Sequence, residues 1–155
     1  MIHRTIVLPD IHVPNHNQKA IDAILKFIPY FKPHRLIQLG DFCDFDSLST
    51  FKMYHPKDFV TMSDEIDAAT KLLSKIDKVT PKSCKKYMIG GNHEDRYHQA
   101  KAKYMFPPDK VTGAVLNWQR SWADEYELDK RGWEWCEYGG HFQFGKIVFT
   151  HTCGS

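Results

Sequence analysis

The fold is indicated most clearly by the stretch Leu36-Ile37-Gln38-Leu39-Gly40-Asp41-Phe42-Cys43-Asp44. A short apolar run that breaks into Gly-Asp is typical of a buried strand that delivers carboxylates into the loop at its carboxyl end. In open α/β sheets, ligands bind at that edge. A lone Gly-Asp is most often a simple loop cap, but other strand ends of this chain carry side chains of the same kind.

Two further apolar runs end in polar residues. Thr5-Ile6-Val7-Leu8 is followed by Asp10-Ile11-His12, and Tyr87-Met88-Ile89 is followed by Gly91-Asn92-His93-Glu94. If the strands are parallel, as β-α-β connection predicts, their carboxyl ends meet at the same edge of one sheet. We therefore expect these polar side chains to gather around Asp41.

Two amphipathic helices are predicted between the three strands. The first should end at Pro29 and Pro33, and the second is expected over residues 63–78, with acidic residues in its first turn and lysines in its last. Their apolar stripes follow helical spacing and comprise Ile21, Ile24, Leu25 and Ile28 in the first helix, and Ile66, Ala69, Leu73 and Ile76 in the second. Alternation of strands and helices predicts a layered α/β fold.

The remaining third of the chain is predicted to continue with helices and then strands. A helix from Glu94 to Tyr104 should break at Pro107-Pro108, and a short helix is expected near residues 116–125, with Trp118 and Trp122 on one face. Residues 132–150 are typical of strands joined by a turn at Gly139-Gly140. The run 146–149 is predicted to be a buried strand that ends at His151, the fourth strand end with a metal-competent side chain.

Composition limits the classes of function. With 155 residues and 42% hydrophobic content, the chain can form one domain with a substantial core. A net charge of +2 implies no strong field for nucleic acid, although nine histidines make metal or acid-base chemistry worth considering. The four cysteines show no zinc spacing, which indicates reduced thiols. We find no signal peptide and no apolar run near the roughly 18 residues needed to span a bilayer, so a cytoplasmic protein without membrane contact is expected.

The order of the polar segments resembles the calcineurin-like metallophosphoesterases over nearly the whole chain. The segments are Asp10-x-His12, Gly40-Asp41-x-x-Asp44, Gly91-Asn92-His93-Glu94 and the strand-terminal His151. The first and third look most like small phage and bacterial members. The resemblance implies a single domain over residues 1–155 with the four-layer α/β fold of that family, a β-sandwich of two mixed sheets flanked by helices.

The resemblance also implies a binuclear metal site. Asp10, His12 and Asp41 would hold one divalent ion, and Asp41, Asn92 and His151 the other, so that Asp41 bridges the two. A hydroxide between ions about 3.5–4 Å apart would attack phosphorus. We expect manganese as the metal, with iron, zinc, nickel and magnesium as alternatives.

Other residues near the metals have two interpretations each. By the resemblance, His93 protonates the leaving group or stabilises charge on it, and Asp44 holds its imidazole; a loop cap is the alternative for Asp44. Arg96 is a candidate ligand of the substrate phosphate, although an ion pair with Glu94 or Asp95 would explain it as well. Both acids lie in the first turn of a helix, where carboxylates are favoured, and we expect them to support the site.

Two features depart from the family pattern. His151 is followed by Thr152, where the family usually has Gly. A later Gly-His-x-His segment, whose histidines complete the metals, is expected beyond Ser155, and His141 is not expected to replace it. We therefore expect a domain truncated at its C-terminus, with water filling the vacant metal positions. Its open edge would suit a homo-oligomer or a complementing chain.

Three functions are compatible with these residues. The leading hypothesis is a phosphodiesterase or nuclease with a phosphoester substrate, nucleic acid among the candidates. A phosphomonoesterase, including one like the Ser/Thr protein phosphatases, shares the same motifs, since Gly-Asn-His-Glu occurs in both classes. The third hypothesis is a catalytically impaired fragment that acts as a binding or assembly module.

Overall fold

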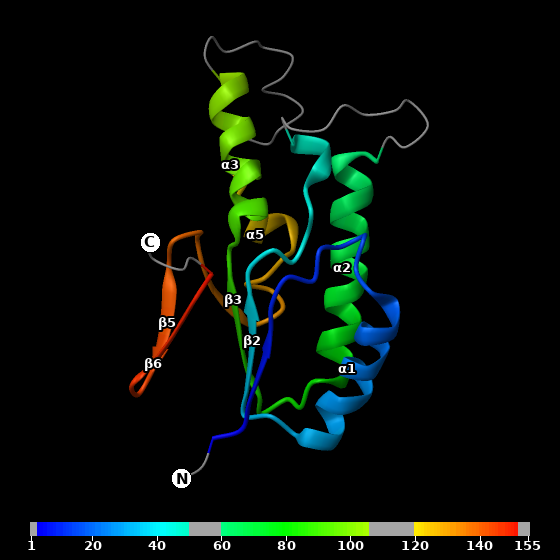
Figure 1. The fold of residues 1–155 in the computed structure, drawn as a ribbon, viewed down its shortest axis with the longest axis vertical. Coiled ribbons are helices and arrows are strands. Elements are labelled where there is room, and N and C mark those ends of the chain that lie inside the picture. Colours follow the sequence, from blue (N-terminus) through cyan, green and yellow to red (C-terminus); the bar gives the residue numbers. More distant parts are fainter. Residues whose placement is uncertain (1–2, 50–59, 106–119, 152–155) are drawn as a thin grey trace.

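A parallel sheet of four strands forms the centre of the protein. The computed structural model describes residues 3–49, 60–105 and 120–151. Neighbouring strands are parallel and follow the order β1-β2-β3-β4 (Figure 1), which confirms the parallel arrangement predicted for the first three. The strands are β1 (Thr5–Leu8), β2 (Arg35–Leu39), β3 (Lys85–Ile89) and β4 (Trp133–Cys136).

Two long helices cover one face of this sheet. α1 (Gln18–Phe31) and α2 (Met62–Val79) lie against each other and against the strands (Figure 1). Both predicted apolar stripes face the core: Ile21 and Ile28 are buried in α1, as are Leu73 and two of its stripe neighbours in α2, and the other stripe residues are partly buried against the core. α2 begins one residue earlier than predicted, after Thr61, whose hydroxyl caps the N–H of Asp64. The α/β architecture is therefore confirmed.

Pro29 does not end the first helix, contrary to the sequence prediction. α1 continues to Phe31 and is capped by Lys32, whose backbone is left-handed (φ 49°) and whose N–H donates to the carbonyl of Ile28. A proline removes one N–H and crowds the carbonyl four residues earlier. Close to a helix end only the last turn must accommodate this, and Ile28, fully buried, stabilises that turn by packing.

Further helices lie beyond the carboxyl ends of the strands. In the described part of the chain they are η1 (Asp46–Leu48), α3 (Asn92–Met105) and α5 (Trp122–Glu125). α3 begins two residues earlier than predicted. Trp122 packs on Tyr126, and Tyr126 on Phe42, each pair with ring centroids 5.8 Å apart. This aromatic packing supports the loop after β2. The predictions for residues 50–59, for Pro107-Pro108 and for Trp118 lie outside the described residues.

An antiparallel hairpin lies on the opposite side of the sheet from α1 and α2 (Figure 1). It consists of β5 (His141–Phe144) and β6 (Ile147–Thr150). Phe142 and Phe144 pack against Tyr87 of β3, with ring centroids 5.0 and 4.9 Å apart. Across residues 3–49, 60–105 and 120–151, one sheet is thus purely parallel and the other purely antiparallel.

The prediction of a buried strand at residues 146–149 is wrong. Ile147 is 61% exposed and Val148 is 52% exposed. The strand pairs with β5 alone, and it is β5 that supplies the rings facing the parallel sheet. An apolar run reports the tendency of a segment to be buried, but not whether a second layer covers it.

Two properties of the described part of the chain bear on its setting. Cys43, Cys84 and Cys136 are free thiols. None of the described helices combines the length and apolar character needed to cross a bilayer.

Asp77, in the last turn of α2, connects this helix to the edge of the sheet. Its carboxylate accepts hydrogen bonds from Lys86 Nζ (2.7 Å), Arg131 Nη1 (3.0 Å) and Trp133 Nε1 (2.9 Å). Lys86 and Arg131 are only 15% exposed, so both charges depend on this carboxylate for compensation. Asp77 therefore holds β4 against β3 and α2.

We expect Asp77→Ala to lower the free energy of unfolding by about 2 kcal/mol, because it leaves largely buried donors without this acceptor. Urea denaturation measures this. Asp67→Ala is the control, since Asp67 is exposed on the same helix, and its change should stay below about 0.5 kcal/mol. Equal effects of the two substitutions would contradict the role assigned to Asp77.

Candidate metal centre

The loops after β1 and β2 run side by side beyond the end of the sheet. His12 N–H donates to the carbonyl of Asp41 (3.0 Å), and Val13 N–H to that of Phe42 (2.9 Å). Asp44 N–H returns a hydrogen bond to the carbonyl of Val13 (2.9 Å). The parallel ladder therefore continues into the polar segments and fixes their register, as parallel strand ends predict.

Three polar residues of these loops have left-handed backbones. The φ angles are 46° at Asp10, 58° at His12 and 51° at Asp41. Asp and His adopt this region more readily than most residues, but each such position still costs on the order of 1–3 kcal/mol. Strained positions cluster at functional sites because the surrounding structure holds them there.

Two glycines permit the close approach of the strand ends. A Cβ at Gly40, where φ is 84°, would overlap the imidazole of His151. A Cβ at Gly91 would overlap the carboxylate and backbone nitrogen of Asp41. The glycines before Asp41 and Asn92 are therefore required by contact, which gives the Gly-Asp and Gly-Asn motifs a physical basis.

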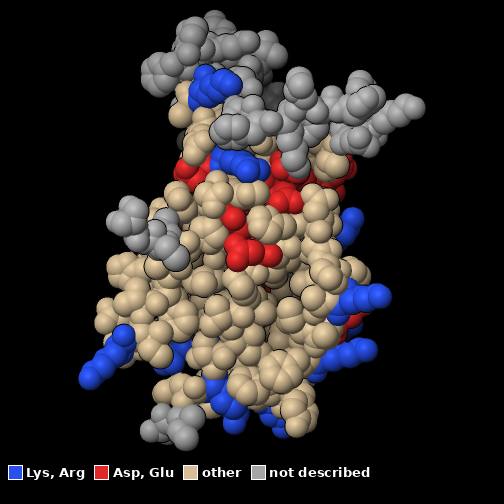
Figure 2. All heavy atoms as spheres, viewed as in Figure 1, with Lys and Arg blue, Asp and Glu red and all other residues tan. Residues whose placement is uncertain are grey.

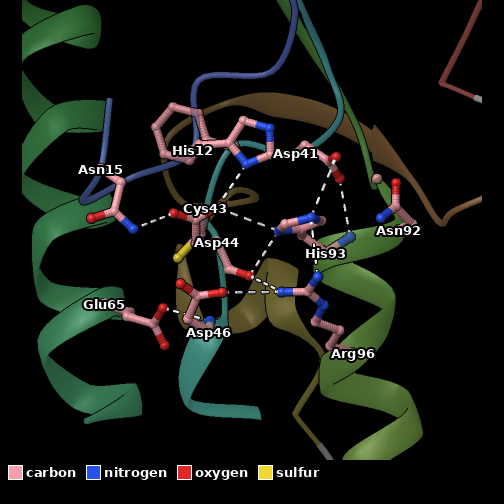
Figure 3. A network of polar contacts seen from close by, with 12 residues as sticks. His12, Asn15, Asp41, Cys43, Asp44, Asp46, Glu65, Asn92, His93 and Arg96 are labelled. Carbon is pink, nitrogen blue, oxygen red and sulfur yellow. Dashed lines mark hydrogen bonds and ion pairs between the residues drawn. The ribbon is translucent and has the colours of Figure 1, made fainter. Parts of the chain in front are cut away.

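Figure 3 shows Asp41 between His12 and Asn92, with His93 close to its side chain. The side chain of Asp41 is 8% exposed, and its Oδ1 accepts the N–H of His93 (3.0 Å). Among the described residues, two groups have ligand atoms within 4.8 Å of one another: His12, Asp41 and His93, and Asp10, Asp41 and His151. Asp41 belongs to both groups, but Asp10 lies with His151 and not, as the resemblance implied, with His12.

Acidic side chains gather on this part of the surface. Figure 2 shows them around the centre and upper part of one face, with a basic side chain between them, whereas most Lys and Arg residues lie lower and at the flanks. A divalent cation is therefore attracted to this end of the protein, although the net charge of the chain is +2.

Asp44 serves two histidines rather than His93 alone. Its Oδ1 accepts a hydrogen bond from His12 Nδ1 (2.7 Å), and its Oδ2 accepts one from Asn15 Nδ2 (2.6 Å) (Figure 3). The nearer partner of His93 Nδ1 is the Asp44 carbonyl, at 2.8 Å, and the carboxylate is 3.5 Å away. With Nδ1–H directed at the carboxylate, His12 presents its Nε2 lone pair, as metal-binding histidines commonly do.

The pKa values of this pair shift in opposite directions. Burial opposes ionisation of Asp44, but hydrogen bonds from His93, Asn15 and His12 outweigh it and lower the pKa of Asp44 below its ordinary value. Asp44 in turn raises the pKa of His93, with a smaller contribution from Asp41, against burial and the charge of Arg96. The pair favours an ionised carboxylate beside an imidazole that holds a proton more strongly than usual.

His151 and Asn92 complete the other side of the site. His151 Nδ1 donates to the carbonyl of Leu39 (2.7 Å), which leaves Nε2 of a neutral ring as an acceptor. This nitrogen lies 3.1 Å from Oδ1 of Asn92 and 3.5 Å from Oδ2 of Asp41. Three acceptor atoms thus converge without a donor between them. Imidazole, amide oxygen and carboxylate are ligands that divalent cations accept, and these residues fit such an ion.

Glu94 is a residue whose importance the sequence did not reveal. It is 1% exposed, and it accepts the N–H groups of Asp41, Phe42 and Cys43 (3.0 Å each) and of Gly91 (2.8 Å). Burial raises the pKa of Glu94, and the backbone N–H donors oppose that rise. The predicted supporting role was that of a first-turn carboxylate, whereas the side chain joins two loops.

Glu65 holds the next segment, η1, by accepting hydrogen bonds from backbone N–H groups. It is also 1% exposed and accepts the N–H groups of Asp46 (2.7 Å) and Ser47 (3.2 Å). The sequence could have indicated this role of Glu65, because Glu65 lies four residues before Ala69 on the buried stripe of α2. A charged residue on an apolar stripe indicates a buried polar contact.

Arg96 contacts neither of the acids proposed as its ion-pair partners. Its Nη1 donates to the Asp44 carbonyl (2.8 Å) and lies 3.5 Å from Oδ1 of Asp46, and its Nη2 donates to His93 Nε2 (3.2 Å). Asp95 accepts from Gln99 instead, and the carboxylate of Glu94 is occupied by backbone N–H groups. The guanidinium therefore belongs to the site.

The sequence model of the calcineurin-like phosphoesterases matches residues 3–152. The chain belongs to this family. Membership makes the protein a phosphoester hydrolase with an α/β fold, and the family uses divalent metal ions, for which the two His/Asp groups are candidate ligands. No curated protein matches the chain.

We expect Glu94→Gln to weaken both the fold and the metal centre of this phosphoesterase. The amide nitrogen would face backbone N–H groups that need an acceptor, which should lower the free energy of unfolding by about 3 kcal/mol. Displacement of Asp41 should reduce Mn²⁺ affinity about tenfold or more. Calorimetric titration and urea denaturation measure the two effects.

Glu65→Gln is the matched control, because Glu65 is equally buried but holds only η1. It should lower stability while leaving Mn²⁺ affinity nearly unchanged. If both variants lost metal affinity equally, the specific role of Glu94 at the metal centre would be excluded.

Proposed function

We propose that the protein is a binuclear-metal phosphoesterase of the phosphodiesterase or nuclease type. The observation that supports this proposal is the presence of Asp41 in both ligand groups, one with His12 and His93 and the other with Asp10 and His151. The family resemblance pairs the ligands differently: Asp10, His12 and Asp41 would hold one ion, and Asp41, Asn92 and His151 the other. Divalent ions bound there supply Lewis acidity toward the phosphoryl oxygens and lower the pKa of bound water toward neutrality.

The protein orients its own ligands for this chemistry. Nδ1–H of His12 is held by the Asp44 carboxylate, and Nδ1–H of His151 by the Leu39 carbonyl. Both rings therefore direct Nε2 toward the centre without further rearrangement. Fixed orientation of this kind commonly changes metal affinity or activity by about 10–100-fold.

The second task of the protein is to protonate the leaving oxygen. His93 is the residue proposed for it, and Asp44 favours the protonated imidazole by raising its pKa. Such proton transfer typically contributes a factor of about 10²–10⁴. Arg96, with its guanidinium beside His93, is the proposed ligand of the substrate phosphate.

Metal identity and architecture are proposed on the same basis. Carboxylate, imidazole and amide oxygens suit manganese, with iron, zinc, nickel and magnesium as alternatives. We infer that residues 1–155 belong to one domain and that the β5–β6 hairpin is part of the second sheet of a β-sandwich. Nucleic acid is the proposed substrate class, and we infer that the protein associates with a second copy or with another chain.

The test compares Mn²⁺-dependent hydrolysis of bis-p-nitrophenyl phosphate with that of the monoester. We expect the diester to react faster, and His93→Ala to abolish turnover while the metal content stays nearly intact. Faster cleavage of the monoester would favour a phosphomonoesterase. Failure to cleave either ester with any of the five metals would contradict the proposed activity and favour a binding or assembly module.

A further inference from the structure

Three imidazoles surround Asp41, and each donates its Nδ1–H to an oxygen. The acceptors are the Asp44 carboxylate for His12, the Leu39 carbonyl for His151 and the Asp44 carbonyl for His93. All three rings therefore present Nε2 as the nitrogen with a free electron pair. His93 differs in one respect, since its Nε2 accepts a hydrogen bond from Arg96 Nη2 at 3.2 Å.

His93 is placed where it could bind a cation. It forms a candidate ligand group with His12 and Asp41. Its Nε2 lies 3.9 Å from Oδ2 of Asp41, and its ring centroid lies 4.8 Å from that of His12. His93 thus shares its ring type and a candidate ligand group with His12, and it differs from His12 in its hydrogen bond with Arg96.

A guanidinium and a metal ion compete for the same electron pair. Arg only donates, and it keeps its charge at every accessible pH, so its partner nitrogen must be unprotonated. A cation that bound Nε2 would have to displace this hydrogen bond and approach a fixed positive charge. The contact therefore disfavours metal binding by His93 twice, once by occupying the lone pair and once by repulsion.

We propose that Arg96 is a positioning residue that occupies Nε2 of His93 and excludes this imidazole from metal coordination, which reserves it for proton transfer. This inference rests on the proposed function. A substrate phosphate would draw the guanidinium away from His93. Nε2 would then accept a proton from solvent water and pass it to the leaving oxygen. The same Arg96 side chain would thus serve the ring first and the phosphate second.

The backbone of Asp44 makes this arrangement rigid. Its carbonyl accepts both His93 Nδ1–H (2.8 Å) and Arg96 Nη1–H (2.8 Å), so the three groups close a triangle. Asp46 lies 3.5 Å from the same Nη1, and its own N–H is held by Glu65 (2.7 Å). The two terminal nitrogens of the arginine fork bond two acceptors, the Asp44 carbonyl and His93 Nε2, in different directions. Figure 3 shows this arrangement.

The test measures Co²⁺ binding to the Arg96→Met variant. Calorimetric titration gives the affinity, and the visible absorption spectrum reports the ligands of the bound ion. We expect binding to tighten about tenfold and the spectrum to change, because His93 joins the coordination. Both changes should disappear in the Arg96→Met, His93→Gln double variant. If the loss of positive charge alone were responsible, Arg96→Met would instead tighten Co²⁺ binding equally with His93 present and with His93→Gln. Arg96→Lys, which keeps the charge, should bind Co²⁺ nearly as the unaltered protein does.

A second readout needs no metal. In the metal-free protein, at a pH above the titration of imidazole, ¹⁵N resonances should show His93 protonated at Nδ1 and unprotonated at Nε2, with assignment by His93→Gln. A proton on Nε2 would overturn the inference, as would Co²⁺ binding and spectra that Arg96→Met leaves unchanged. If the unaltered protein bound no divalent ion, both the proposed function and this inference would be wrong. If it bound metal with an affinity that does not depend on Arg96, this inference alone would be wrong.

Discussion

The carboxylate of Glu94 lies between two loops and accepts hydrogen bonds from four backbone N–H groups, three of them in the segment Asp41–Cys43 and one at Gly91. Each of these donors would cost about 1–3 kcal/mol if it were buried without an acceptor. An ionised carboxylate is itself expensive to bury, but four donors offset much of that cost. Glu94 also lies in the first turn of α3, where the helix dipole favours negative charge. This one side chain therefore fastens the loop after β2 to the loop after β3.

The geometry of the candidate centre depends on that fastening. It holds Asp41 in its left-handed conformation, with its carboxylate packed against Gly91 where a side chain would not fit. Gly40, on the other side of Asp41, leaves room for His151, which arrives from a strand end more than one hundred positions later in the chain. Ligands from distant parts of the sequence thus converge because small residues and one buried acid bring their backbones into contact.

Much of the fold was predictable because it follows from periodicity. Helical stripes and apolar runs located three strands and two helices, and parallel topology brought their polar ends to one edge. The end of a helix was less predictable. α1 continues past Pro29 because tertiary packing holds its last turn. The exposure of Ile147 and Val148 could not be predicted from an apolar run, since burial depends on which layer covers a strand.

The candidate site was predictable in its residues but not in its connections. Which of two groups on Asp44 serves which histidine depends on loop geometry, and the chain uses its carboxylate for His12 and its carbonyl for His93. The position of Arg96 likewise follows from the place of the Asp44 carbonyl rather than from the charges beside it in sequence. Such contacts depend on the exact positions of loop atoms, which sequence patterns do not specify.

We propose that the Asp41 carboxylate joins two metal ions at the carboxyl ends of the strands. Anomalous diffraction from crystals grown with Mn²⁺ would locate these ions. Two manganese peaks are expected, both in contact with the Asp41 carboxylate, one beside His12 and the other beside His151. A single peak, or two peaks of which one does not touch Asp41, would contradict this proposal.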